Sequence, residues 1–112
     1  MVGVGGDFSG GNVYRISLEG SKPPEMWKSP HGILDGVVLL PNGDLLISDW
    51  GAASSPTEGA ITEYTTDGNR VRQIGAAAAL HGPADFTYDA ATSMLWVPLM
   101  VDNRVTAIEL IR

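Results

Sequence analysis

One short pattern, His-Gly-x-x-Asp, occurs twice in this chain and constrains its fold more than any other feature. It spans residues 31–35 and returns fifty residues later at 81–85, so that it ends once at Asp35 and once at Asp85. Each copy leads through a further run and a turn into a second strand-like segment. Repetition at this period, with several short strands in each unit, is typical of β-propellers. We predict that the two aspartates mark the starts of two successive innermost strands.

Alternating apolar and polar residues, separated by turn signals, divide the rest of the chain into strands as well. The apolar run at 36–40 predicts a strand buried on both faces, and Asn42-Gly43 predicts a tight hairpin turn. Residues 75–80 are rich in alanine but too few to form a helix by themselves. The predicted strands are residues 1–4, 12–18, 25–28, 36–40, 45–50, 60–65, 70–74, 85–88, 95–100 and 104–110.

Named A to D from the axis to the rim, these strands read B-C-D, A-B-C-D and A-B-C. The predicted fold class is therefore all-β, a single partial β-propeller domain over residues 1–112. It contains about two and a half to three four-stranded antiparallel blades, at residues 1–30, 31–75 and 81–112. A closed propeller needs at least four such blades. The chain is accordingly expected to be part of a larger ring or one of several copies that close a ring.

Strand order also predicts which residues share an end of the blades. In an antiparallel meander the D-to-A and B-to-C connections lie at one end, and the A-to-B and C-to-D turns lie at the other. The first end is predicted to surround the mouth of the channel and to carry Asp35, Asp85 and the loop at 51–59. The residues predicted to face the channel and a substrate there are His31, Trp50, His81 and Asn103. Trp27, Trp50 and Trp96 are expected to pack in the blades rather than to form a ligand cage, with Trp50 the exception because it opens the loop on the channel face.

Carboxylates that converge on one axis repel each other, and this cost must be offset. A bound Ca²⁺ or another divalent cation does so with oxygen ligands, whereas the absence of cysteine excludes thiolate sites. Protonation and hydrogen bonds to backbone N–H groups are alternatives. An Asp at a fixed blade position equally serves to cap a turn. Asp35 and Asp85 are thus candidate metal ligands, and Asp35 is the candidate catalytic residue. A histidine nearby serves as a base or ligand, or only in packing.

Composition excludes several classes of function. The net charge is −6 with seven Lys and Arg, so a basic footprint for nucleic acid is missing. No apolar stretch reaches the length of a membrane span, and the first residues do not resemble a signal peptide. A soluble chain is expected, in a compartment that the sequence leaves open. The glycines at 3–11 do not have the spacing of a dinucleotide or phosphate loop, so no nucleotide cofactor is expected.

A family resemblance supports the propeller prediction. Residues Leu34–Trp50 resemble the blade motif of the senescence marker protein/gluconolactonase/luciferin-regenerating-enzyme family. Residues Gly82–Asp89, with Val97–Leu99 and Asp102–Val105, look like the C-terminal blade of its bacterial members. NHL-repeat and strictosidine-synthase-like propellers share the blade motif. The resemblance implies a six-bladed propeller with a divalent cation, typically Ca²⁺, in its channel, and often lactone hydrolysis. Of the Glu, Asn and Asp ligands of the family, only the Asp of the Asp-Gly motif matches here, and it is Asp35.

Two functions follow as predictions. The first is the C-terminal half of a metal-dependent, lactonase-like hydrolase, incomplete as a catalyst by itself because the other ligands would lie upstream. The second is a non-enzymatic half-propeller that self-assembles as a binding or structural module. The expected partner is another copy, because two copies offer about six blades, or else the missing N-terminal blades. A small neutral or lactone ligand is compatible with this site, and no nucleic acid or membrane partner is expected.

Overall fold

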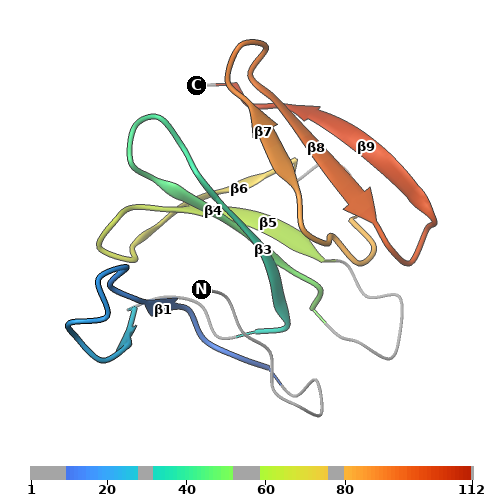
Figure 1. Ribbon diagram of the computed structural model, residues 1–112. Coiled ribbons are helices and arrows are strands. Elements are labelled where there is room, and N and C mark those ends of the chain that lie inside the picture. The colour runs from blue at the N-terminus through green and yellow to red at the C-terminus, as the bar shows by residue number, and fades with distance from the viewer. Residues whose placement is uncertain (1–9, 28–31, 52–58, 76–79, 112) are drawn as a thin grey trace.

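The structure is a computed structural model that describes residues 10–27, 32–51, 59–75 and 80–111. In these residues the chain is all-β, as predicted, and its strands form three antiparallel sheets of two, four and three strands (Figure 1). The molecule measures 40 × 36 × 21 Å. The strands are β1 (Tyr14–Arg15), β2 (Glu25–Met26), β3 (Leu34–Leu39), β4 (Leu45–Asp49), β5 (Ala60–Tyr64), β6 (Arg70–Ile74), β7 (Thr87–Asp89), β8 (Met94–Leu99) and β9 (Arg104–Glu109).

Every strand predicted within the described residues is present, and most differ by one or two residues at each end. The largest difference is at 12–18, where only Tyr14–Arg15 form a strand, β1. The predicted strand at 1–4 lies outside the described residues. Strand order follows sequence order in all three sheets, β1-β2, β3-β4-β5-β6 and β7-β8-β9, so each sheet is an antiparallel meander.

Turn chemistry explains how the meanders reverse. The predicted turn between β3 and β4 is confirmed: Gly43 adopts a φ of 93°, which favours glycine, and the Asn42 side chain accepts a hydrogen bond of 3.0 Å from the backbone N–H of Asp44. Between β5 and β6, Gly68 has a φ of 84°. The local sequence therefore fixes two hairpins of the four-stranded sheet, β3-β4 and β5-β6.

The same backbone contact joins one sheet to the next at two places. Gly11, which precedes β1, forms an antiparallel bridge with Gly32, which precedes β3. Gly59, which precedes β5, forms an antiparallel bridge with Leu80 ahead of the third sheet. In both cases the first residue donates its N–H to the carbonyl of the second at 2.7 Å. The partners are 21 positions apart in both cases, and the second bridge follows the first by 48 residues, close to the fifty-residue repeat of the sequence.

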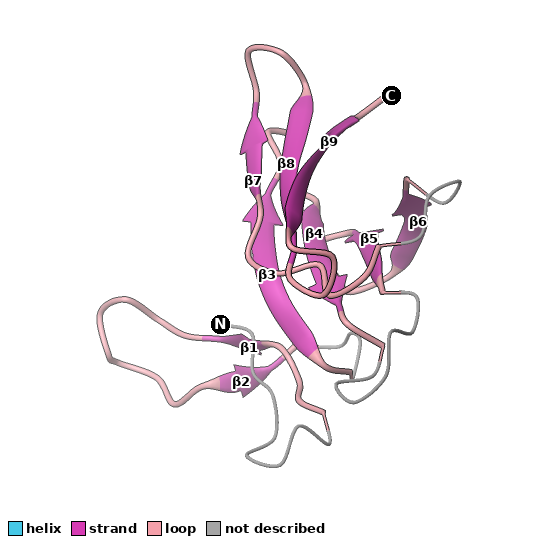
Figure 2. Cartoon of the chain, turned by 90° about the vertical axis from the view of Figure 1, so that its right-hand side faces the viewer, coloured by secondary structure: helices cyan, strands magenta, loops and turns pink. Residues whose placement is uncertain are grey.

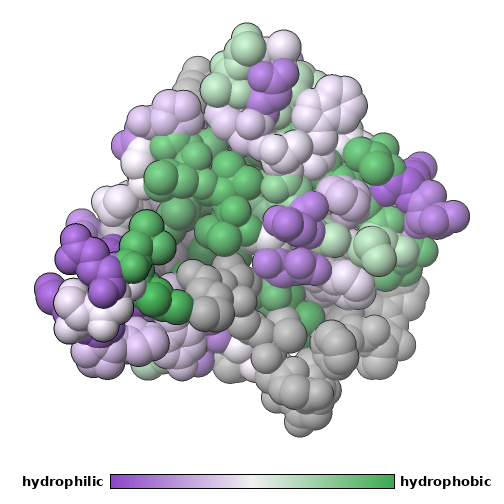
Figure 3. Space-filling model, viewed as in Figure 1, coloured by the Kyte–Doolittle hydropathy of each residue, from purple (hydrophilic) through white to green (hydrophobic). Residues whose placement is uncertain are grey.

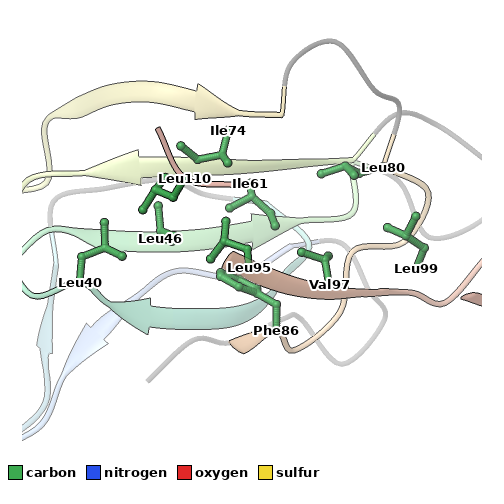
Figure 4. Packing of buried hydrophobic residues seen from close by; sticks show 10 residues of the cluster. All are labelled: Leu40, Leu46, Ile61, Ile74, Leu80, Phe86, Leu95, Val97, Leu99 and Leu110. Carbon is green, nitrogen blue, oxygen red and sulfur yellow. The ribbon is translucent and has the colours of Figure 1, made fainter. Parts of the chain in front are cut away.

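The main core lies between the four-stranded and three-stranded sheets (Figure 4). Leu46 and Ile61 from the four-stranded sheet are fully buried, as are Leu95 and Val97 from the three-stranded sheet. Side chains from the connecting segments complete the cluster. Its buried members are Leu40, Leu46, Ile61, Ile74, Leu80, Phe86, Leu95, Val97, Leu99 and Leu110. Burial of these apolar side chains is the main force that holds the two sheets together.

A smaller core joins the two-stranded sheet to the four-stranded sheet. Its buried members are Val13, Leu34 and Ile47. The rings of Trp27 and Tyr64 meet edge to face, with centroids 6.1 Å apart, and partly cover this cluster. Burial raises the pKa of the Tyr64 hydroxyl above its ordinary value. The prediction that Trp27 is a packing residue is confirmed.

Two burial predictions were wrong. The strand at 36–40 was expected to be buried on both faces, but within β3 Val37 is 37% and Leu39 67% exposed. The short β1-β2 sheet is too small to cover that face, and an open hollow of about 270 Å³ lies between Val37 and Trp27. Figure 3 shows apolar surface gathered over β3 and β4 on this side. Trp96 is 48% exposed on the outer face of β8, since no further sheet packs there among the described residues.

Candidate functional site

Asp35 lies in β3, and Trp50 directly follows β4. The two strands pair so that Leu34 opposes Asp49, which brings Asp35 and Trp50 to the same end of the sheet. The Nε1–H group of Trp50 donates a hydrogen bond of 3.2 Å to Oδ2 of Asp35. The Asp35 side chain is exposed, and among the described residues its Oδ1 receives no hydrogen bond. Asp35 and Trp50 therefore lie at the same end of the sheet, as strand order predicted, and they contact each other directly.

The backbone at Asp85 lies close in space to the Asp35-Gly36 segment of β3, but the two aspartates differ in local structure. Asp85 occupies a bend two residues before β7, whereas Asp35 lies within its strand. A Cβ atom on Gly36 would come within 3.0 Å of the Asp85 Cα and within 2.8 Å of the Phe86 ring. The absence of a side chain at Gly36 thus lets the segments that open β3 and β7 lie side by side (Figure 2).

Ser48 holds these two segments together, a role that sequence reasoning missed. Its hydroxyl, fully buried, accepts a 2.7 Å hydrogen bond from the N–H of Gly36 and donates one of 3.2 Å to the carbonyl of Ala84. One side chain therefore satisfies a donor from β3 and an acceptor ahead of β7. The sequence signal was weak, because a serine in the run Leu45–Asp49 resembles any solvent-facing position of an alternating strand.

Asp49 is a second residue that the sequence analysis missed. Its Oδ1 accepts hydrogen bonds from the backbone N–H groups of Ile33, at 3.2 Å, and Gly51, at 2.9 Å. In the second copy of the repeat, Pro83 occupies the position of Ile33 and Leu99 occupies the position of Asp49. Proline has no N–H group, so the acceptor is not needed there, and Leu99 is buried in the core. This paired change was the signal that could have assigned Asp49 a structural role.

Of the two residues predicted to face the channel in the second copy, His81 contacts Asp102, the neighbour of Asn103, and not Asn103 itself. His81 lies ahead of β7, and the turn between β8 and β9 contains Asp102 and Asn103. The His81 ring contacts the Asp102 carboxylate at 2.9 Å, so the two connections do share one end of the sheet as strand order predicted. Asn103 is exposed and has a φ of 53°, which makes it a turn residue. His31 lies outside the described residues.

The donor set that the structure describes is only part of what a Ca²⁺ ion requires. Calcium takes six to eight oxygen ligands. In residues 10–27, 32–51, 59–75 and 80–111, no three His, Asp or Glu side chains lie close enough together to hold an ion. Asp35 and Asp85 therefore do not make a complete calcium site with the described side chains, and we assign no catalytic step to a metal ion.

Comparison with known proteins adds no relative. No protein-family model, curated protein or solved structure matches this chain. Within the described part of the chain there is no helix of the length and apolar character needed to cross a membrane.

Proposed function

We propose that this chain is a segment of a β-propeller hydrolase of the lactonase type, and that Asp35 is its contribution to a site shared with other blades. The single observation that supports this most is the exposed carboxylate of Asp35, whose Oδ2 accepts a hydrogen bond from the Trp50 indole. A carboxylate held this way by a donor is typical of metal ligands and catalytic bases. Calcium or another divalent cation remains the proposed cofactor, with its other ligands from outside the described residues.

The propeller arrangement is supported by three features of the sheets. Each sheet is an antiparallel meander, the segment that leads into β7 lies against Gly36 of β3, and a bridge like the one that precedes β3 recurs ahead of the third sheet. In a propeller the first strand of every blade faces the channel. The β1-β2, β3–β6 and β7–β9 sheets would then be C-D, A-B-C-D and A-B-C of successive blades.

Lactone hydrolysis tests the proposed role of Asp35. In the ring completed by further blades, and in the presence of Ca²⁺, we expect hydrolysis of a sugar δ-lactone faster than the uncatalysed rate, and we expect Asp35→Asn to lower this excess by about 100-fold, since it removes a charged ligand or base. Asp67→Asn, the same change in an exposed turn, is the matched control and should have no effect. A rate that is unchanged both by a chelator and by Asp35→Asn would contradict the proposal.

Self-assembly is the second candidate function, and exposed apolar side chains at both ends of the sheet series favour it. Val105 on the β9 edge strand is 62% exposed, and Met26 on β2 is 65% exposed. Open sheet edges and apolar patches favour association. We expect light scattering to give the mass of a dimer, and Val105→Lys to shift the chain toward monomer. A wild-type chain that stays monomeric at high concentration would count against this function.

A further inference from the structure

His81 and Asp102, separated by 21 positions in the chain, form a close pair at the end of the third sheet. Nδ1 of His81 lies 3.0 Å from Oδ1 and 2.9 Å from Oδ2 of Asp102. An ionised carboxylate only accepts hydrogen bonds, so Nδ1 carries the proton in this contact. In the neutral ring, Nε2 is then the basic nitrogen.

The backbone holds both partners in place independently of this contact. The N–H of Val101 donates to the His81 carbonyl at 3.3 Å, and the N–H of Met100 donates to the Gly82 carbonyl at 2.9 Å. Gly82 has a φ of 65°, and a Cβ atom there would come within 2.8 Å of the Val101 side chain. The glycine after His81 therefore permits the close approach of the β8-β9 turn, which accounts for the His-Gly pair in this copy of the repeat.

The pair is accessible and has one further charged neighbour. The side chains of His81 and Asp102 are 31% and 26% exposed, so water reaches the ring. The guanidinium of Arg104 lies 3.8 Å from Oδ2 of Asp102 and is mostly exposed. Within the described part of the chain, Nε2 of His81 has no hydrogen-bond partner. An imidazole whose Nδ1–H is fixed by a carboxylate and whose Nε2 is unoccupied is the arrangement used in general-base catalysis.

We propose that His81 is a general base for attack of water on an ester or lactone carbonyl, and that Asp102 is its positioning residue. Nε2 removes a proton from water as the water oxygen bonds to the carbonyl carbon. The bond from that carbon to the leaving oxygen then breaks, and this oxygen takes the proton back from the imidazolium. The products are a carboxylic acid and an alcohol. For lactones the inference rests on the proposed function.

Hydrolysis of 4-nitrophenyl acetate without metal ions tests His81 separately from lactone hydrolysis. We expect the wild-type chain to release nitrophenol at least about tenfold faster than 4-methylimidazole at the same concentration. His81→Gln and Asp102→Asn should each lower this rate by about 100-fold, because general-base catalysis contributes roughly 10²–10⁴-fold. Asp67→Asn is the matched control, and circular dichroism checks that each variant is folded. If lactones are inert but these results hold, the proposed lactonase function fails and the inference about His81 stands.

Three results would overturn the inference. The first is a wild-type rate no greater than that of the folded His81→Gln variant. The second is an acetyl group found on His81 by mass spectrometry, which would mean that the ring acts as a nucleophile. The third comes from nitrogen NMR of the His31→Gln variant, in which His81 is the only histidine. We expect the neutral His81 ring to be protonated at Nδ1 in this variant, and at Nε2 once Asp102→Asn is added. Protonation at Nε2 while Asp102 is still present would remove the basis of the mechanism.

Discussion

Leu95→Ala is expected to lower the free energy of unfolding by about 2–5 kcal/mol, the usual range for a leucine in a well-packed core. Leu95 is fully buried on β8, where it faces the four-stranded sheet, and its β-ladder neighbours are Tyr88 and Ile108. Truncation removes apolar contacts with both sheets and leaves a cavity between them. Chemical denaturation followed by circular dichroism measures the change.

The adjacent residue supplies the control for Leu95. Trp96 is a larger side chain, but it is 48% exposed and lies on the opposite face of β8. We expect Trp96→Ala to cost only about 1 kcal/mol, since surface substitutions perturb stability little. A one-residue change in register would exchange the two faces of the strand. A larger loss for Trp96→Ala than for Leu95→Ala would therefore contradict the register of the third sheet.

Arg72→Met is expected to destabilise the fold by about 2 kcal/mol, because it leaves a buried carboxylate without its partner. Glu63 on β5 is 3% exposed, and its Oε2 lies 2.8 Å from Nε of Arg72 on β6. Removing one member of a fully buried ion pair costs roughly 3–5 kcal/mol. The Arg72 side chain is 39% exposed, so water moderates the loss.

A double variant separates the ion pair from other effects of Arg72. The Arg72 guanidinium also donates to the carbonyl of Ile111 at 2.5 Å, which ties β6 to the end of the chain. Adding Glu63→Leu to Arg72→Met removes the unpaired charge, and we expect it to restore most of the lost stability. If the double variant is less stable than Arg72→Met alone, the loss lies in the contact with Ile111 and in side-chain packing.

Local patterns were sufficient to predict the strands but not the coverage of their faces. Alternation and the Asn42-Gly43 turn predicted β3 to β6 to within two residues. The burial of β3 was predicted wrongly because a continuous apolar run reports only that its residues are apolar. Whether both faces are covered depends on neighbouring sheets, and the β1-β2 sheet leaves Leu39 open.

The candidate site was predictable in its location and not in its contacts. Strand order predicted that His81 and the β8-β9 turn lie at one end of the three-stranded sheet. It predicted in the same way that Asp35 and Trp50 lie at one end of the four-stranded sheet. It did not single out Asp102 as the partner of His81, because that contact depends on how the positive φ of Gly82 turns the backbone. The role of Ser48 depends on the distance between two sheets, which the sequence pattern of β4 does not contain.

The contact at Gly36 makes the series of sheets directional. Gly36 on β3 of the four-stranded sheet has no side chain, and the Phe86 ring ahead of β7 lies against it. The position in the third sheet that corresponds to Gly36 is Phe86 itself, so the third sheet has no equivalent space for an aromatic ring. A second copy that packed beside β7 would need a junction different from the one between the four-stranded and three-stranded sheets. In any ring closed by two copies the seam between the copies would thus differ from this junction, and the order of the units within each copy could not be exchanged.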